Sequence, residues 1–201
     1  MKKFTVRTSL KSLFLLIVVF FASIPFLSAA NYYVSKSGND ANSGLSAALA
    51  KLTIKAATDL ATTGDVVFIS TGYYAEIVAV SNSMTLMVDS VQVNELTMNK
   101  TGITLTIDGN ANEKTFNIKS KLTLTDGLVK VGSSLAALRA LDGCTVGAGT
   151  KTSYIDGALY IGLTSGSTSM TFPLGSGTDF RAVSLSFSKS KGALTYFWFQ
   201  M

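Results

Sequence analysis

Apolar and polar residues alternate in the middle of the chain, in short runs that repeat. Residues 84–90 (MTLMVDS) align with residues 103–109 (ITLTIDG) at an offset of 19 residues, and residues 122–127 (LTLTDG) follow 19 residues later with one position deleted. A period of two directs alternate side chains to opposite faces of a strand. The runs therefore predict short strands with one apolar face in a narrow core, stacked as the successive coils of a solenoid.

A helical pattern precedes these runs. In residues 45–61, apolar residues recur at steps of three and four, at Leu45, Leu49, Leu52, Ala56 and Leu60. This spacing predicts an amphipathic helix. A solenoid needs such a cap because its first coil otherwise exposes an apolar cross-section and unpaired strand edges. We therefore expect residues 31–65 to form an N-terminal cap of strand, loop and helix, and residues 66–150 to form the coils.

Two segments around this helix resemble a known family. Residues 32–44 (YYVSKSGNDANSG) and 64–76 (GDVVFISTGYYAE) are similar to the opening of secreted, pectate-lyase-like proteins. The resemblance implies an all-β fold, a right-handed parallel β-helix with an N-terminal capping helix. It implies no single activity, because β-helices include lyases, hydrolases and inert stalks.

An antiparallel β-sandwich is the alternative architecture, since short strands joined by Gly, Asn and Asp turns suit it as well. The 19-residue period favours the solenoid. Pro173 is the only proline after residue 30. A low proline content suits ladders in which nearly every backbone N–H group is needed.

Residues 151–201 form a β-rich C-terminal segment in this interpretation. Residues 152–159 (TSYIDGAL) and 171–183 (TFPLGSGTDFRAV) resemble a segment of large adhesin-like surface proteins of Gram-negative bacteria that glide or use type IX secretion. Further domains usually follow in such proteins, so we expect this chain to be truncated. The aromatic cluster Tyr196–Phe199 would then lie exposed, and we expect self-association through the C-terminal end.

The first 30 residues have the layout of a secretory signal peptide. Basic residues precede an apolar run at 13–27, and the small residues 28–30 follow it. We expect cleavage before Asn31 and a secreted or outer-surface location, in preference to a membrane anchor. No membrane span remains after cleavage. Removal of this segment leaves 13 basic against 12 acidic residues, a net charge of +1, so the sequence gives no support for nucleic-acid binding.

The residue types present limit the chemistry. The chain has no histidine and a single cysteine, Cys144. Catalytic triads and histidine-ligated zinc sites are therefore excluded. Cys144 is interpreted as a small apolar residue of the core.

Three aspartates are the only candidates for a metal site. Asp89, Asp108 and Asp126 each precede Ser or Gly and end a predicted strand, with Lys100, Lys119 and Lys121 in adjacent segments. The family resemblance implies that Ca²⁺ held by carboxylates would act beside a basic residue. One carboxylate per coil provides too few oxygens for Ca²⁺. We therefore expect a structural ladder of turn residues, with no catalytic residue and no cofactor.

Other segments that could carry function have structural interpretations. Residues 40–44 (DANSG) predict a capping turn rather than a Ca²⁺ loop, and the Gly-rich residues 175–178 predict a hairpin turn. Tyr73, Tyr74 and Tyr196–Phe199 could stack on sugar rings, but core packing is the more frequent use of such aromatic residues.

The expected function is that of a non-catalytic module. We expect an adhesin-like structural or carbohydrate-binding protein whose partners are polysaccharides or cell-surface glycans. The alternative is a polysaccharide lyase or another carbohydrate-active enzyme of the pectate-lyase-like class, which the resemblance alone supports.

Overall fold

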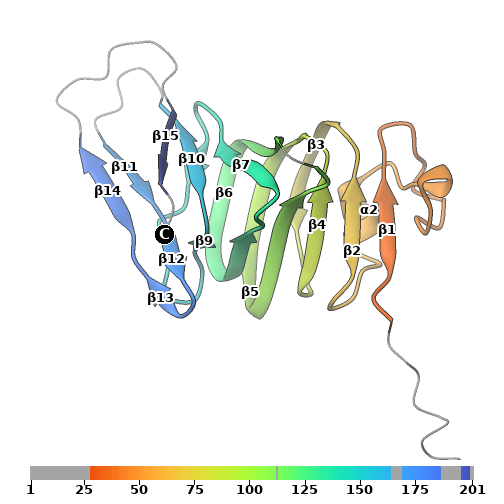
Figure 1. Cartoon of the computed structure of the whole chain (residues 1–201), viewed down its shortest axis with the longest axis horizontal. Helices are drawn as coiled ribbons and strands as arrows, with labels where there is room; N and C mark the ends of the chain where they lie inside the picture. The colour runs from red at the N-terminus through yellow and green to blue at the C-terminus, as the bar shows by residue number, and fades with distance from the viewer. Residues whose placement is uncertain (1–27, 112, 164–168, 187–195, 200–201) are drawn as a thin grey trace, which may run out of the picture.

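The computed structural model describes residues 28–111, 113–163, 169–186 and 196–199. The protein is 58% strand and 5% helix, and it forms a β-solenoid of about five turns (Figure 1). The all-β parallel β-helix is thereby confirmed. Among the described strands, antiparallel pairing is confined to the C-terminal ones, so the sandwich alternative is wrong.

One continuous sheet follows the long axis of the molecule. Its strands pair in parallel in the order β1 (Asn31–Val34), β2 (Val66–Ile69), β4 (Met84–Val88), β5 (Val91–Gly109), β6 (Lys114–Val131), β7 (Leu135–Ala140) and β10 (Leu159–Gly162). Strands β3 (Gly72–Ala79), β8 (Thr145–Val146), β9 (Ile155–Asp156) and β12 (Leu174–Ser176) add further parallel pairs.

Strands β5 and β6 bend around the solenoid, so each contributes to more than one face. We call face A the surface formed by β1, β2, β4 and the C-terminal ends of β5 and β6. Face B is formed by the N-terminal ends of β3, β5 and β6 together with β7 and β10. Bulges in the β5–β6 register mark the corners.

Equivalent inward positions of successive coils make the core. Val67, Leu86 and Ile107 lie in register on β2, β4 and β5, and all three are completely buried. Adjacent strands are about 4.8 Å apart, so these side chains stack along the axis. The apolar alternation in the sequence therefore identified the inward face correctly.

The repeat length is less regular than the sequence predicted. Met84 pairs with Leu105 rather than with Ile103, and Thr104 pairs with Leu128. The 19-residue alignment is therefore wrong as a coil register. The corners contain different numbers of residues, which changes the length of each coil without changing the alternation within its strands.

The capping helix is shorter than predicted. A 3₁₀ turn, η1 (Ala47–Leu49), precedes helix α2 (Ile54–Thr58). Ile54 and Ala57 are buried against the first coil, whereas the predicted apolar stripe is exposed at Leu45 (59%), Leu49 (50%), Leu52 (36%) and Leu60 (45%). The Asp40 carboxylate accepts the backbone N–H groups of Leu52 and Thr53, which holds this part of the segment extended and stops a continuous helix.

Antiparallel strands cover the C-terminal end. Strand β15 (Tyr196–Phe199) pairs with β10, and Phe199 contacts Phe172 edge-on at 5.0 Å between ring centroids. Phe197 and Phe199 pack against the core. Phe197 and Phe199 are therefore not exposed as predicted, whereas the side chains of Tyr196 and Trp198 lie outside the described residues. Self-association through the C-terminal end stays a prediction, but exposed Phe197 and Phe199 rings do not support it.

The remaining elements complete this end. Strand β13 (Asp179–Phe180) forms a hairpin with β12, which confirms the turn predicted at residues 175–178. Strands β11 (Ser169–Phe172) and β14 (Val183–Ser186) form a separate two-stranded sheet. No helix of the described residues has the length and apolar character needed to cross a membrane. Most of the predicted signal peptide, residues 1–27, lies outside the described residues.

Candidate functional site

The predicted aspartate ladder does not form. Asp108 is in register with Met87, and Asp126 is in register with Asn99, so neither aligns with Asp89. No group of three or more Asp, Glu, Cys or His side chains suited to a metal ion occurs among the described residues. The three aspartates instead have separate hydrogen-bonding roles.

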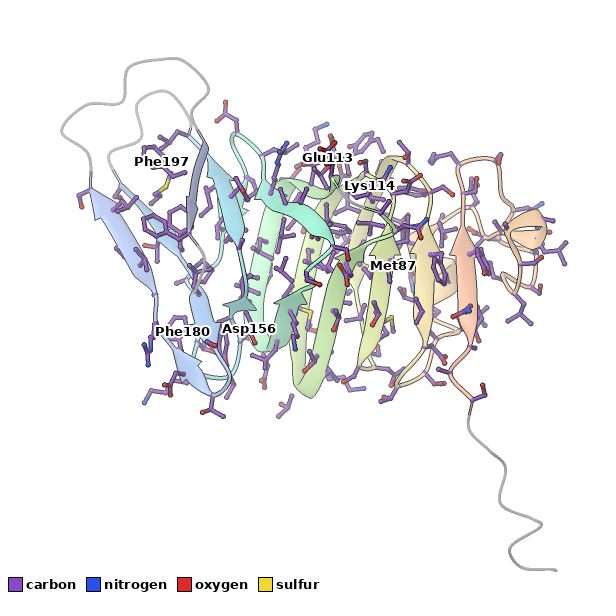
Figure 2. The ribbon with its side chains drawn as sticks, in the orientation of Figure 1. Met87, Glu113, Lys114, Asp156, Phe180 and Phe197 are labelled. Carbon is purple, nitrogen blue, oxygen red and sulfur yellow. The ribbon has the colours of Figure 1, made fainter. Side chains whose placement is uncertain are left out.

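Asp89 joins two adjacent turns. Its carboxylate forms an ion pair with Lys114 at 2.7 Å and accepts the Thr71 hydroxyl at 3.2 Å. The hydrogen bond from Lys114 is the main reason why the pKa of Asp89 lies below its usual value. Both residues of the pair are about one-third exposed, so the pair contributes only modestly to stability. Lys114 is labelled in Figure 2.

Asp108 and Asp126 both bind backbone N–H groups. Asp108 accepts from Gly109 at 2.8 Å and from Ser134 at 2.9 Å, and Gly132 passes so close that an added Cβ would meet this carboxylate. Asp126 accepts from the Thr101 hydroxyl at 2.5 Å and from the Gly127 N–H group at 3.0 Å. Each carboxylate thus fastens a turn of its own coil to a neighbouring one.

Two other predicted candidates are structural. The Tyr74 side chain is buried, and its hydroxyl donates to the Ser70 carbonyl at 3.0 Å. Burial raises the pKa of this phenol to about 12. Cys144 is half-buried, and desolvation raises its pKa to about 11, so the thiol remains protonated and unreactive at neutral pH.

Face B carries a continuous outward column of polar and aromatic side chains. Tyr73 is in register with Gln92, Gln92 with Asn117, Asn117 with Arg139, and Arg139 with Tyr160. Each strand contributes one member, and buried residues flank the last four. The five side chains, Tyr73, Gln92, Asn117, Arg139 and Tyr160, are called the face B column.

A cation lies over the aromatic ring at each end of this column. The Lys119 ammonium is 5.0 Å from the centroid of the Tyr73 ring, and the Arg139 guanidinium is 5.8 Å from that of Tyr160. The Tyr73 hydroxyl also donates to the Asn94 amide oxygen on β5. Tyr73 is 41% exposed. These contacts orient the two rings; the other four members of the column are partly buried.

Asn117 is held at the centre of the column. Its amide nitrogen donates to the Val91 carbonyl at 3.3 Å and to the Thr115 hydroxyl at 3.1 Å. The amide oxygen is therefore the group that Asn117 presents to a ligand.

Face A also has outward aromatic side chains, but they contact each other. The Tyr33 and Phe68 rings are stacked at 5.2 Å with an interplanar angle of 13°, and Met87 follows in the next coil. Ring faces that cover one another along the axis are not available to a ligand. We interpret this stack as structural.

Of the column, the sequence identified Tyr73 alone. The missed members share one signal, a polar or aromatic residue between two apolar ones, as in residues 91–93 (VQV), 116–118 (FNI), 138–140 (LRA) and 159–161 (LYI). The irregular coil length hid their alignment.

Comparisons of the chain with models of known families, with curated proteins and with solved structures find no match. The interpretation of the column therefore depends on its own chemistry.

Proposed function

We propose that this protein is an exported, non-catalytic module that binds a polysaccharide or cell-surface glycan along face B. The observation that carries the proposal is the register of the face B column, which places one polar or aromatic side chain on each successive coil. The signal-peptide layout of residues 1–30 supports a location where such glycans occur.

The chemistry of the column suits sugar rings. The Gln92 amide provides donors and an acceptor for hydroxyl groups, the Asn117 amide oxygen provides an acceptor, and the Arg139 guanidinium adds further donors. Tyr73 and Tyr160 provide apolar ring surface. A pyranose presents the same combination of hydroxyl edges and apolar C–H faces.

The spacing suits a repeating ligand. Neighbouring strands are about 4.8 Å apart, so the column of five strands spans about 19 Å along the axis. A sugar unit in an extended glycan has a length close to this strand spacing, and a chain laid along the axis meets one side chain per unit. Weak contacts in register add up along such a ligand.

The column contains amides, phenols and a guanidinium but neither Asp nor Glu. Glycoside hydrolysis normally uses a pair of carboxyl groups flanking the scissile bond. A lyase of the pectate-lyase-like class would need carboxylates to hold Ca²⁺, so binding without bond cleavage is the function that this surface supports best.

Co-sedimentation with insoluble cellulose, chitin and xylan, together with affinity electrophoresis in soluble polysaccharides, tests the proposal. We expect retention by at least one polysaccharide, and we expect Tyr73→Ala and Tyr160→Ala each to weaken it about five-fold or more. Tyr33→Ala on face A is the matched control and leaves retention unchanged. Equal loss in the control, or no retention by any polysaccharide, would contradict the proposal.

A further inference from the structure

An open pocket of about 330 Å³ lies across four successive coils, at the corner opposite the face B column. It lies between the turns at residues 101–104, 126–128, 151–154 and 177–178. Its volume is within the range of about 300–1,000 Å³ that small-molecule sites occupy. The face B column does not contribute to it, and of the three turn aspartates discussed above only Asp126 lines it.

The Tyr154 side chain joins the floor of the pocket to one of its walls. Ile103, Leu128 and Tyr154 provide an apolar floor. Tyr154 is buried, and its hydroxyl donates to the Gly177 carbonyl at 2.5 Å, which holds the β12–β13 hairpin as a wall. Gly175 approaches the Tyr154 ring so closely that an added Cβ would lie 2.5 Å from it. Phe180 and Asp156, labelled in Figure 2, lie near this wall.

The rim of the pocket is rich in hydroxyl groups. Thr101, Thr104, Thr152 and Thr178 lie along it, together with Asp126 and Lys151. Hydrogen bonds from Thr101, Gly127 and the Thr152 side chain lower the pKa of Asp126, Thr101 contributing most, so this residue is a carboxylate at neutral pH. A carboxylate has about four acceptor positions, and these three partners leave one for a ligand hydroxyl.

We propose that this pocket binds a neutral sugar, with the apolar face of one pyranose ring on Ile103 and Leu128 and a hydroxyl group donating to Asp126. The rim carries one negative and one positive side chain, so it favours neither an anion nor a cation. The apolar floor suits the C–H face of a pyranose, and the hydroxyl-rich rim suits its hydroxyl edges. This site is separate from the face B column and does not depend on it.

Saturation-transfer NMR of the purified protein with D-glucose, D-galactose, D-mannose and N-acetyl-D-glucosamine tests the assignment. We expect transfer to at least one sugar. Thr178→Trp fills the exposed rim and abolishes that transfer, whereas Thr145→Trp, at an exposed threonine of β8, leaves it intact. Asp126→Asn keeps the volume and weakens binding about ten-fold, because a hydrogen bond to a charged acceptor becomes a neutral one.

Three results would overturn the assignment. The first is no transfer to any of the four sugars. The second is transfer that persists undiminished in both Thr178→Trp and Asp126→Asn. The third is transfer that is lost in Tyr160→Ala but retained in Thr178→Trp. The last result would assign the sugar to face B instead. Thermal unfolding of each variant checks that the fold is intact, and Asp126→Asn decides the matter if Thr178→Trp does not fold.

Discussion

The Glu76 carboxylate on β3 accepts the backbone N–H groups of Ile54 and Lys55, at 2.9 and 2.8 Å, and so caps helix α2 from the first coil. The Thr53 hydroxyl accepts the next free N–H group, that of Ala56, at 3.1 Å. These groups have no partner within the helix. The side chain of one strand residue thus fastens the cap to the end of the solenoid.

Replacement of Glu76 by alanine should destabilise the protein. We expect a loss of about 1–2 kcal/mol in the free energy of unfolding, as for other helix caps, measured by urea denaturation. Glu95→Ala is the control, because Glu95 lies in register with Ile77 and Lys121 and accepts no helix N–H group. This variant should lose about 0.5 kcal/mol or less. Equal losses in the two variants would show that Glu76 has no capping role.

Asp65 links the stability of the cap to pH. It is 3% exposed and accepts the backbone N–H group and the hydroxyl of Thr62, at 2.7 and 3.0 Å. In the uncleaved chain it also accepts the backbone N–H group of Ala30 at 2.7 Å. Burial alone would raise its pKa, but hydrogen bonds from Thr62 and Ala30 outweigh this and lower the pKa. A lowered pKa means that Asp65 stabilises the fold above the unfolded-state pKa, and that this contribution disappears as the pH falls through the folded-state value.

Asp65→Asn should therefore lower the free energy of unfolding by about 1–3 kcal/mol at pH 7. The reason is that the amide NH₂ group replaces one acceptor oxygen and then faces backbone N–H donors. Below about pH 4 the difference from the wild-type protein should shrink. Thermal unfolding between pH 2.5 and 7 measures both effects. Asp59→Asn, in the exposed pair with Lys55, is the control and should change stability little. A pH-independent difference for Asp65→Asn would contradict this account.

Calcium should neither bind tightly nor stabilise the fold. Asp89, Asp108 and Asp126 lie in different registers, and each accepts hydrogen bonds from neighbouring turns. Calorimetric titration with CaCl₂ should show no binding in the micromolar range, since Ca²⁺ takes six to eight oxygens. Micromolar binding that is lost in Asp108→Ala would instead support the lyase alternative.

The sequence predicted the inward faces of the strands but not how the coils align. Alternation depends on each strand alone, so Leu86 and Ile107 could be assigned to the core from local pattern. Register depends on the number of residues at each corner, which no local pattern specifies. For this reason the sequence predicted an aspartate ladder, although Asp108 is in register with Met87 and not with Asp89. The face B column was not recognised for the same reason.

The cap shows a second limit of local pattern. Residues 45–61 are rich in Ala and Leu, so two helical stripes fit the segment equally well, and packing decides between them. The stripe containing Ile54 and Ala57 is buried, while Leu45 and Leu49 remain exposed. The start of the helix near Thr53 could be recognised, because threonine is a favourable N-cap residue.

Amide NMR of the labelled protein tests glycan binding along face B most directly. Titration with cellohexaose, xylohexaose and chitohexaose should shift the backbone amides of Gln92, Asn117 and Arg139 together, since a ligand along the axis contacts consecutive coils. Thr85 and Thr106, in register on face A, should not shift. Shifts confined to face A, or no shifts with any of the three hexaoses, would contradict the account.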